Sequence, residues 1–351
     1  MPNRQHPLTY GECQALKGLA ILGIVLHNFC HYLPHAALEN EFSFSQARTL
    51  QFFHLLSNVT HAPVNVFSFL GHYGVPIFLF CTGYGLVMKY EQSDSLVPVP
   101  RFLFSHYCKL LWLMLPGLVI TLSAIALYAH KFLVTWSGFL LQATLLINFH
   151  PDAVTIIKPG PYWYFGFVMQ IYLFYRLLIY RRHWCWIIFW IVVCWLVQVL
   201  QQPDGSMLEW IRHNFVMGIL PLSMGVVCGR QVKTISLSAM VWVMIALVSL
   251  CGVVAFNLHF QLWLWCPVLV IVGAVAFVKC LGQRVIRPFH FLGTLSSALF
   301  VMHPLARVFT VYHAQTANPY VWLLIYLILS LALALLYRLL LKRMPHNCNI
   351  V

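Results

Sequence analysis

Long apolar stretches recur along almost the whole chain and are separated by short polar segments. A helix needs about 20 apolar residues to cross the hydrocarbon layer of a bilayer, and most of these stretches approach that length. The pattern therefore predicts an all-α, polytopic transmembrane helix bundle. The expected helices lie near residues 15–33, 66–88, 106–129, 162–180, 184–200, 207–229, 235–257, 260–280, 290–311 and 319–341.

The segment 132–150 departs from this pattern, because it is apolar but short and interrupted by polar residues such as Gln142. If it crossed the membrane, Arg176, Arg181 and Arg182 would lie outside, against the rule that short cytoplasmic loops are rich in Lys and Arg. We therefore expect it to form a re-entrant or outer-face helix, which leaves about ten crossings with both termini in the cytoplasm. The basic residues then predicted outside are Arg48, Lys131, Lys158, Arg212 and Arg307.

Composition supports the membrane assignment. The 351 residues are 61% hydrophobic and 8% charged, whereas a soluble domain carries about 25% charged residues. A water-exposed surface cannot be built from so few charges, which excludes a soluble globular protein. The first apolar run begins only after Lys17 and lacks a cleavage site of small residues, so we expect a first transmembrane helix rather than a signal peptide. One transmembrane domain over residues 1–351 is the simplest organisation.

Charge and cysteine content add little chemistry. The net charge of +13 arises from 21 Lys and Arg against 8 Asp and Glu. In a polytopic membrane protein this excess sets orientation, so membrane lipid is an expected partner and nucleic acid is not. The 11 cysteines form no CxxC pair, which favours packed, reduced thiols over disulfides or a zinc site.

The first predicted helix carries the clearest candidate for chemistry. His27 lies deep in its apolar run and is followed by Asn28 and His31. Ionisable groups inside a bilayer are costly, which makes each one a functional hypothesis, and a neutral imidazole can remove a proton from a hydroxyl near pH 7. The alternative is a structural histidine that bonds to a neighbouring helix or reaches the outer interface.

Three further segments combine polar and aromatic residues: 71–84, 161–172 and 291–304. Taken singly, each is explained equally well by close helix packing or by an aromatic belt at the interface. Their candidate side chains are His72, Thr82, Tyr162, Trp163, Gln170, Tyr172, Ser296 and His303.

In this order the four segments resemble the acyltransferase-3 family of integral membrane acyltransferases. That family has Arg or Lys followed after ten intervening residues by His, a GVxxFFxxSGF-like helix, a Trp-rich segment leading into QFY, and a late LGxxSYxLYLxH helix. The counterparts here are Lys17 with His27, residues 74–84, Trp163 with Gln170 and Tyr172, and residues 292–303.

Two departures from the family pattern concern side chains at the predicted site. Lys17 and His27 have nine intervening residues, so they lie about 80° apart around the helix, where the family spacing gives about 20°. Asn28 stands at the family distance, and Thr82 stands where the family has Ser.

The resemblance implies transfer of an acyl group, commonly acetyl, from acyl-CoA to a hydroxyl of a cell-envelope sugar or polysaccharide at the bacterial inner membrane. His27 is the expected catalytic base, with Lys17 and Asn28 as further catalytic candidates. His31 joins the side chains named above as a substrate-binding candidate. The inner-side residues Lys89, Arg101 and Lys109 are expected to bind the CoA phosphates, although lipid headgroups would serve equally well as their partners.

Three alternatives stay open at the level of sequence. A transporter or glycan exporter also places polar groups inside a many-helix bundle. Acyl transfer could be direct or could pass through an acyl-enzyme on Ser296, Thr82 or a histidine. His27, His31 and His35 follow at i, i+4 and i+8 and could share a metal ion, but Pro34 disturbs that register and we expect no metal.

Overall fold

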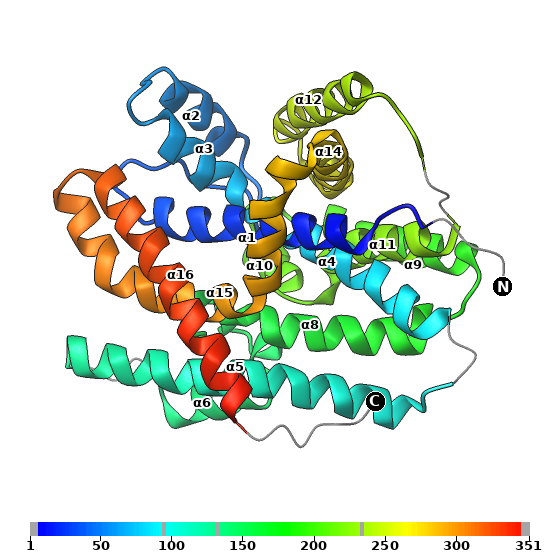
Figure 1. Ribbon diagram of the computed structural model, residues 1–351, viewed down its shortest axis with the longest axis horizontal. Helices are drawn as coiled ribbons and strands as arrows, with labels where there is room; N and C mark the ends of the chain where they lie inside the picture. Colours follow the sequence, from blue (N-terminus) through cyan, green and yellow to red (C-terminus); the bar gives the residue numbers. More distant parts are fainter. Residues whose placement is uncertain (1–5, 93–95, 131–133, 232–234, 345–351) are drawn as a thin grey trace.

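A computed structural model describes residues 6–92, 96–130, 134–231 and 235–344. Within these ranges the secondary structure is helical and contains no strand (Figure 1). The all-α class is confirmed, since each range predicted from the apolar pattern is mostly helical. Two ranges predicted as single helices are broken: 207–229 is divided between Ser206–Arg212 and the stretch Phe215–Gln231, and 260–280 between Phe260–Trp263 and Cys266–Cys280. Arg4, Lys131 and Lys233, three basic residues that entered the topology prediction, lie outside the described residues.

The α-helices are α1 (Tyr10–Cys30), α2 (Gln46–Leu56), α3 (Ala62–Leu70), α4 (Gly74–Leu86), α5 (Val99–Ala129), α6 (Trp136–Ala143), α7 (Ala153–Ile156), α8 (Trp163–Phe174), α9 (Trp184–Val199), α10 (Ser206–Arg212), α11 (Ile219–Gln231), α12 (Ala239–Phe256), α13 (Phe260–Trp263), α14 (Cys266–Cys280), α15 (Gln283–Thr316) and α16 (Pro319–Arg343). Short 3₁₀ or π-helical turns connect or extend them: η1 (Gly71–Tyr73), η2 (Val87–Glu91), η3 (Ile147–Phe149), η4 (Gly160–Tyr162), η5 (Tyr175–Ile179) and η6 (Phe215–Gly218).

Six helical stretches in the described part of the chain are long and apolar enough to cross a membrane: Tyr10–Cys30, Ala62–Glu91, Val99–Tyr128, Ala239–Phe256, Arg284–Thr316 and Pro319–Arg343. A seventh arises if α10 and the stretch Phe215–Gln231, bent by 60°, count as one span. The helices α9 and α14 are apolar but shorter, so the count of about ten crossings stays a prediction. The eight-residue helix α6 is too short to cross, which agrees with the expectation for segment 132–150.

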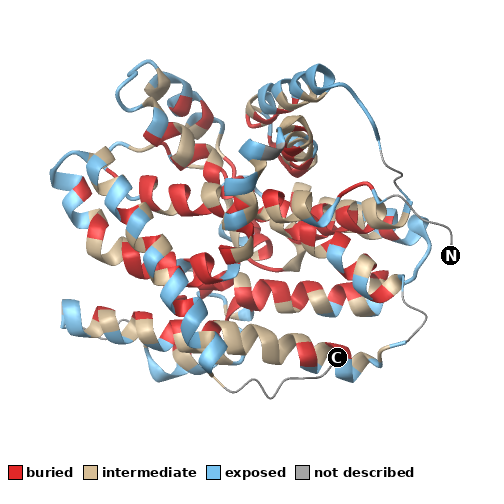
Figure 2. Ribbon diagram, in the orientation of Figure 1, coloured by how far each residue is buried: buried red, intermediate tan, exposed pale blue. Residues whose placement is uncertain are grey.

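Several of these helices carry many exposed residues (Figure 2), and large apolar residues are among them. Met240 and Val248 on α12 are 75% and 69% exposed, and Leu127 on α5 is 77% exposed. Such surfaces are unfavourable in water and favourable against lipid tails. Buried residues gather instead on α1, α4, α8 and α11, which form the interior of the bundle.

The first helix lies in this interior and packs most extensively against α15. Their backbones meet at two glycines: a Cβ on Gly18 would lie 1.8 Å from the Phe289 carbonyl oxygen, and one on Gly293 would lie 1.9 Å from that of Gln14. Small residues allow transmembrane helices this close an approach. The contact holds α1 rigidly in place and fixes the position of the histidine near its end.

Polar contacts group the helix ends into two sets. At one end, which we call the basic end, Arg230 pairs with Glu91 (2.5 Å) and Lys279 pairs with Glu12 (2.8 Å). At the opposite end, the loop end, Arg307 donates to the Asn28 side chain (3.0 Å). The segments 31–45 and 144–162 lie at the loop end. The separation of the two ends agrees with the topology predicted from the sequence, in which successive helices cross in opposite directions.

Candidate functional site

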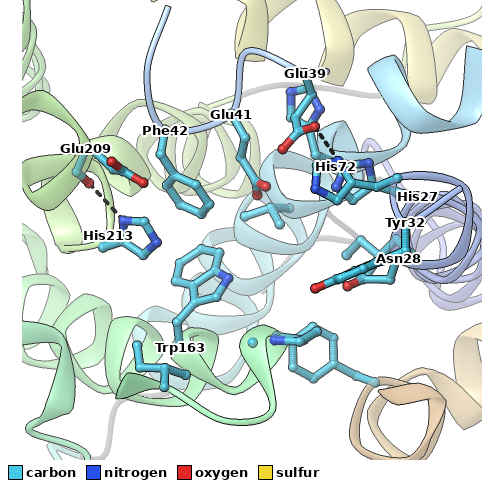
Figure 3. Close-up of a pocket in the computed structure, with 17 residues that line it drawn as sticks. His27, Asn28, Tyr32, Glu39, Glu41, Phe42, His72, Trp163, Glu209 and His213 are labelled. Carbon is cyan, nitrogen blue, oxygen red and sulfur yellow. Dashed lines mark hydrogen bonds and ion pairs between the residues drawn. The ribbon is translucent and has the colours of Figure 1, made fainter. Parts of the chain in front are cut away.

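A cavity of about 260 Å³ opens at the loop end, where α1 finishes (Figure 3). We call it the His27 cavity. The helix stops at Cys30, and Pro34 follows a few residues later, where a proline cannot continue the helical hydrogen bonding. The chain then turns back, so that Glu39 and Glu41 face the histidines of α1 and η1 across the cavity.

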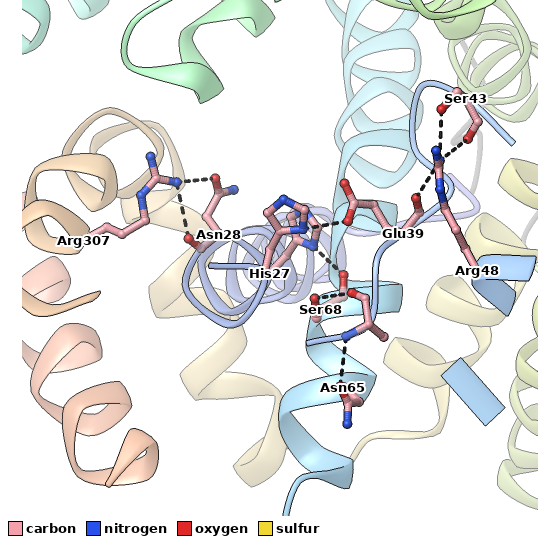
Figure 4. Close-up of polar contacts among 10 residues, drawn as sticks. His27, Asn28, Glu39, Ser43, Arg48, Asn65, Ser68 and Arg307 are labelled. Atoms are coloured by element: carbon pink, nitrogen blue, oxygen red, sulfur yellow. Dashed lines mark hydrogen bonds and ion pairs between the residues drawn. The ribbon is translucent and has the colours of Figure 1, made fainter. Parts of the chain in front are cut away.

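His27 is 7% exposed and is fixed by one hydrogen bond (Figure 4). Its Nδ1 lies 2.8 Å from the Ser68 carbonyl oxygen. A carbonyl can only accept, so Nδ1 carries the proton and the neutral ring keeps its lone pair on Nε2. Gly71 lets η1 approach α1 closely beside this histidine, because a Cβ at that position would lie 2.5 Å from the Gly23 carbonyl oxygen and 2.7 Å from the His27 Cβ.

Glu39 reaches His31 from the loop, with 2.7 Å between the carboxylate Oε2 and the ring Nδ1. The loop is fastened to α3 through Ala37, whose N–H donates to Asn65 Oδ1 (3.0 Å) and whose carbonyl accepts from Ser68 Oγ (2.6 Å) (Figure 4). The same α3 segment therefore positions both His27 and Glu39.

The pKa values of the two loop carboxyl groups shift in opposite directions. Burial raises the pKa of Glu39, but the hydrogen bond with His31 and the nearby imidazoles outweigh it and lower that pKa to about 2. Burial and the charge of Glu39 together raise the pKa of Glu41 well above its usual range. Glu39 is therefore ionised near pH 7, whereas its surroundings favour the protonated form of Glu41, which can donate a hydrogen bond.

His72 in η1 lines the same cavity and is 5% exposed. Its ring lies 5.8 Å from that of His27. Among the described residues, neither ring nitrogen of His72 has a hydrogen-bond partner. Buried polar atoms are nearly always satisfied, so a bound molecule is the natural partner for this imidazole.

A second cavity of about 200 Å³, the Lys17 cavity, holds a different group of the predicted residues. Lys17 lies about 15 Å before His27 along α1, from the helical rise per residue. The structure therefore places these two residues in different cavities. Phe300 lines both. The other predicted side chains in the wall of the Lys17 cavity are Thr82, Tyr172 and Ser296.

Three predicted substrate-binding residues line neither cavity, and each makes a hydrogen bond within the protein. Tyr162 donates to the Val301 carbonyl (3.0 Å). Gln170 donates to Asn214 Oδ1 (2.8 Å). His303 is fully buried, and its Nδ1 lies 3.0 Å from the Leu299 carbonyl of its own helix. By contrast, Asn28, His31 and Trp163 line the His27 cavity as expected.

The predicted CoA-binding residues lie at the basic end. Lys89 and Arg101 are exposed and Lys109 is half-buried. Lys89 stands over the Tyr90 ring (5.1 Å), and the Tyr90 hydroxyl lies 3.2 Å from His106 Nε2.

The His106 ring contacts that of Tyr172 at a tilt of 35° (4.0 Å between ring centroids), and Tyr172 lines the Lys17 cavity. Contacts therefore run from the basic residues of this end to the wall of that cavity.

Glu39, Glu41 and Glu209 line the His27 cavity and were missed from the sequence. No helical spacing marks them, because the two loop residues precede α2 and Glu209 lies in the short helix α10. One signal was present: the chain has only 8 acidic residues, so acidic residues at the predicted outer side were unusual enough to single out.

The cluster of His27, His31 and Glu39 could instead bind a metal ion. Each of His27, His31 and Glu39 offers one possible ligand atom, and these three atoms lie within 4.8 Å of one another. His35 is exposed and has a positive φ of 59°. His31 and Glu39 are 2.7 Å apart, closer than the roughly 3.3 Å between two ligands of one tetrahedral zinc ion. They form a direct hydrogen bond, and the absence of a metal stays a prediction.

The fold and the site together define a multi-pass helical membrane protein with an anchored histidine facing a polar cavity. The family model described as an acyltransferase domain matches residues 12–339, and the chain belongs to that family, the acyltransferase-3 family. Comparison with curated proteins and with solved structures gave no match. The family membership confirms the resemblance found from the motifs and supports an acyltransferase over a transporter.

Proposed function

We propose that this protein transfers an acyl group, typically acetyl, from acyl-CoA to a hydroxyl of a cell-envelope sugar or polysaccharide, in the bacterial inner membrane with both termini cytoplasmic. The observation that carries the proposal is His27. Its Nδ1–H is held by the Ser68 carbonyl, so the Nε2 lone pair is left for a proton at the wall of a polar cavity. A base positioned in this way suits the activation of a hydroxyl.

The chemistry follows from that base. The acceptor hydroxyl oxygen attacks the thioester carbonyl carbon as its proton passes to His27 Nε2. The tetrahedral intermediate then breaks its C–S bond, and the imidazolium returns the proton to the CoA thiolate. The products are an ester and CoA. The Ser68 carbonyl keeps a proton on Nδ1 throughout, so that Nε2 accepts and returns the transferred proton. An aspartate orients the histidine in the same way in a serine hydrolase.

The developing oxyanion needs hydrogen-bond donors. Asn28 is available for this role, since Nδ2 has two N–H groups and donates one to the Ile24 carbonyl (3.0 Å). Trp163 lines the same cavity and offers its indole N–H. Tyr162 is a poorer candidate for this role, because its hydroxyl donates to the Val301 carbonyl.

Direct transfer is favoured over an acyl-enzyme. The hydroxyls of Thr82 and Ser296 donate to backbone carbonyls of their own helices, at 2.8 Å in both cases. Both residues line the Lys17 cavity, away from His27. A nucleophilic hydroxyl needs an adjacent base, and the geometry gives neither residue the imidazole of His27.

The Lys17 cavity is the proposed route of the donor. It is linked by ring contacts to the basic residues that would hold the CoA phosphates, and Lys17 offers a further positive charge inside it. Phe300 lies in the walls of both cavities. The thioester would therefore pass this ring to meet the acceptor beside His27, which assigns Lys17 to donor binding.

The test is His27→Ala in the full chain, assayed with radiolabelled acetyl-CoA and a lipid-linked glycan. Transfer should fall by about 10²- to 10⁴-fold, the usual contribution of a general base, while expression and CoA binding persist. The matched control is His183→Ala, an exposed histidine at the start of α9. Full activity in His27→Ala would refute the catalytic assignment.

A further inference from the structure

One arginine in a membrane-spanning helix keeps its positive charge without an acidic partner. Arg307 lies in the stretch Arg284–Thr316, and its guanidinium forms no ion pair among the described residues. By contrast, Arg48, Arg230 and Lys279 are each paired with a carboxylate. A cation in a spanning helix is costly, which makes it a functional hypothesis.

The contacts of Arg307 lead to the wall of the His27 cavity (Figure 4). Its Nη1 donates to Asn28 Oδ1 (3.0 Å) and to the Asn28 backbone carbonyl (3.3 Å). Its guanidinium lies over the Tyr32 ring, 4.2 Å from the ring centroid. Asn28 and Tyr32 both line the cavity, whereas Arg307 is not among the residues that line it. Arg307 therefore stands behind the wall, and Asn28 connects it to the cavity.

The two neighbours of the Asn28 side chain fix the orientation of its amide group. A guanidinium can only donate a hydrogen bond, and a carbonyl can only accept one. The amide oxygen must therefore face Arg307, and the amide nitrogen must face the Ile24 carbonyl, to which it donates (3.0 Å). One N–H of Nδ2 is left over, on a residue that lines the cavity and directly follows His27.

The charge of Arg307 also strengthens the donor that it orients. A cation at the oxygen of an amide polarises the group, and hydrogen bonds in such a chain reinforce one another. The remaining N–H of Asn28 is then a better donor to an oxygen on which negative charge develops. That oxygen becomes negative only as the thioester carbonyl is attacked, so the gain belongs to kcat rather than to substrate binding.

The other arginine beside the cavity does not orient a donor in this way. Arg212 donates to the Glu41 backbone carbonyl (3.0 Å) and to Gln198 Oε1 (2.6 Å), and it lies over the Trp263 ring at 4.1 Å. Gln198 and Trp263 do not line the His27 cavity. No side chain of the cavity wall therefore receives a hydrogen bond from Arg212.

We infer that Arg307 is a positioning residue for acyl transfer: it fixes and polarises the Asn28 amide, whose remaining N–H stabilises the oxyanion of the tetrahedral intermediate. The inference rests on the proposed function and adds to it a residue behind the cavity wall. Asn28 donates a hydrogen bond and transfers no proton, so the bonds formed and broken are those of the proposed mechanism.

Steady-state kinetics of the full chain in lipid nanodiscs, with acetyl-CoA and a lipid-linked glycan, tests this inference. Asn28→Ala should lower kcat about 10²- to 10³-fold, the usual value of one oxyanion donor. Arg307→Met removes the charge and the donor but keeps a long side chain, and it should lower kcat about tenfold or more with little change in KM. Arg307→Lys restores a charge and a donor and should recover most of that loss. Arg307→Gln, which removes the charge alone, replaces Arg307→Met if that variant does not fold.

The double variant separates positioning from a merely structural role. In the Asn28→Ala background, Arg307→Met should change kcat by less than about twofold, because the group through which it acts is gone. Losses that multiply instead would overturn the inference, and so would an unchanged kcat in Arg307→Met. Wild-type protein that transfers no acetyl group would refute the proposed function, and the inference would fall with it.

Arg176→Met is the matched control. Arg176 also donates to a backbone carbonyl, that of Val97 (2.7 Å), and also lies over a tyrosine ring, that of Tyr180, at 4.2 Å. It is at the basic end, away from the His27 cavity, so its replacement should leave kcat unchanged. An equal loss of kcat in Arg176→Met and Arg307→Met would overturn the inference.

Discussion

The hydrogen-bonded pair of His31 and Glu39 gives the sharpest prediction, because its charge state is set by the fold. The pKa of Glu39 falls from an ordinary 4.5 to about 2, and its side chain is 16% exposed. A depressed carboxyl pKa contributes stability above its unfolded value, and that contribution is lost as the pH falls through the folded value. The shift corresponds to about 3 kcal/mol at most. Glu39→Gln should therefore lower the free energy of unfolding at pH 7 by about 1 to 3 kcal/mol.

Thermal unfolding in detergent, followed by tryptophan fluorescence, measures this difference. At pH 7 the variant should melt a few degrees below the wild type. Between pH 4.5 and pH 2 the gap should close, because the wild-type carboxylate becomes protonated and loses the same interaction. The variant should also lose about tenfold in kcat/KM for acetyl transfer, because His31 and the cavity wall are no longer fixed by the ion pair.

The chain contains a closely matched control. Glu12 pairs with Lys279 at 2.8 Å, with side-chain exposures of 17% and 16%, but at the basic end. Glu12→Gln should destabilise the protein by a similar amount and leave kcat/KM unchanged. The reasoning is refuted if Glu39→Gln melts with the wild type at both pH values, or if Glu12→Gln loses as much activity.

Three further predictions concern other parts of the molecule. Gly71→Ala should lower kcat more than it raises KM, because its Cβ would lie 2.5 Å from the Gly23 carbonyl oxygen and 2.7 Å from the His27 Cβ and would push η1 away from α1 at His27; steady-state kinetics on the folded variant measures the split. Joint replacement of Lys89, Arg101 and Lys109 by Gln should weaken CoA binding about tenfold in a titration, and unchanged binding would reduce them to lipid contacts. The matched control neutralises three exposed basic residues of α16: Arg338, Lys342 and Arg343. Elemental analysis of purified protein should find no stoichiometric zinc, and a one-to-one content would assign the His27, His31 and Glu39 cluster to a metal.

The helices were predictable because each long helix contains a run of apolar residues that can be recognised directly in the sequence. The ends of the helices were not predictable, because the backbone hydrogen bonds of a helix can continue through polar residues beyond the apolar run. The range predicted at 106–129 begins at Val99 in the structure, and the range predicted at 66–88 extends over Ala62–Glu91. The number of crossings is equally hard to predict, because α9 and α14 are apolar but short.

The site was predictable only where a polar residue interrupts an apolar run. His27 stands out for that reason, and so do Gln170 and His303, yet only His27 faces a cavity. Sequence spacing shows that a polar group is buried, but not whether the protein already supplies its partner. Glu39 escaped notice because its position depends on contacts to Asn65 and Ser68, which follow it by more than 25 positions.

The two cavities differ in their polar side chains in a way that fits the two proposed substrates. Cations stand at the basic end beside the Lys17 cavity, where a CoA rich in phosphates would bind, and carboxyl groups line the His27 cavity, where the acceptor would bind. In this arrangement the phosphates would be held at the basic end, and the acyl end of the donor would extend past Phe300. This order would bring the thioester carbonyl beside His27, whose Nδ1 proton is held by the Ser68 carbonyl.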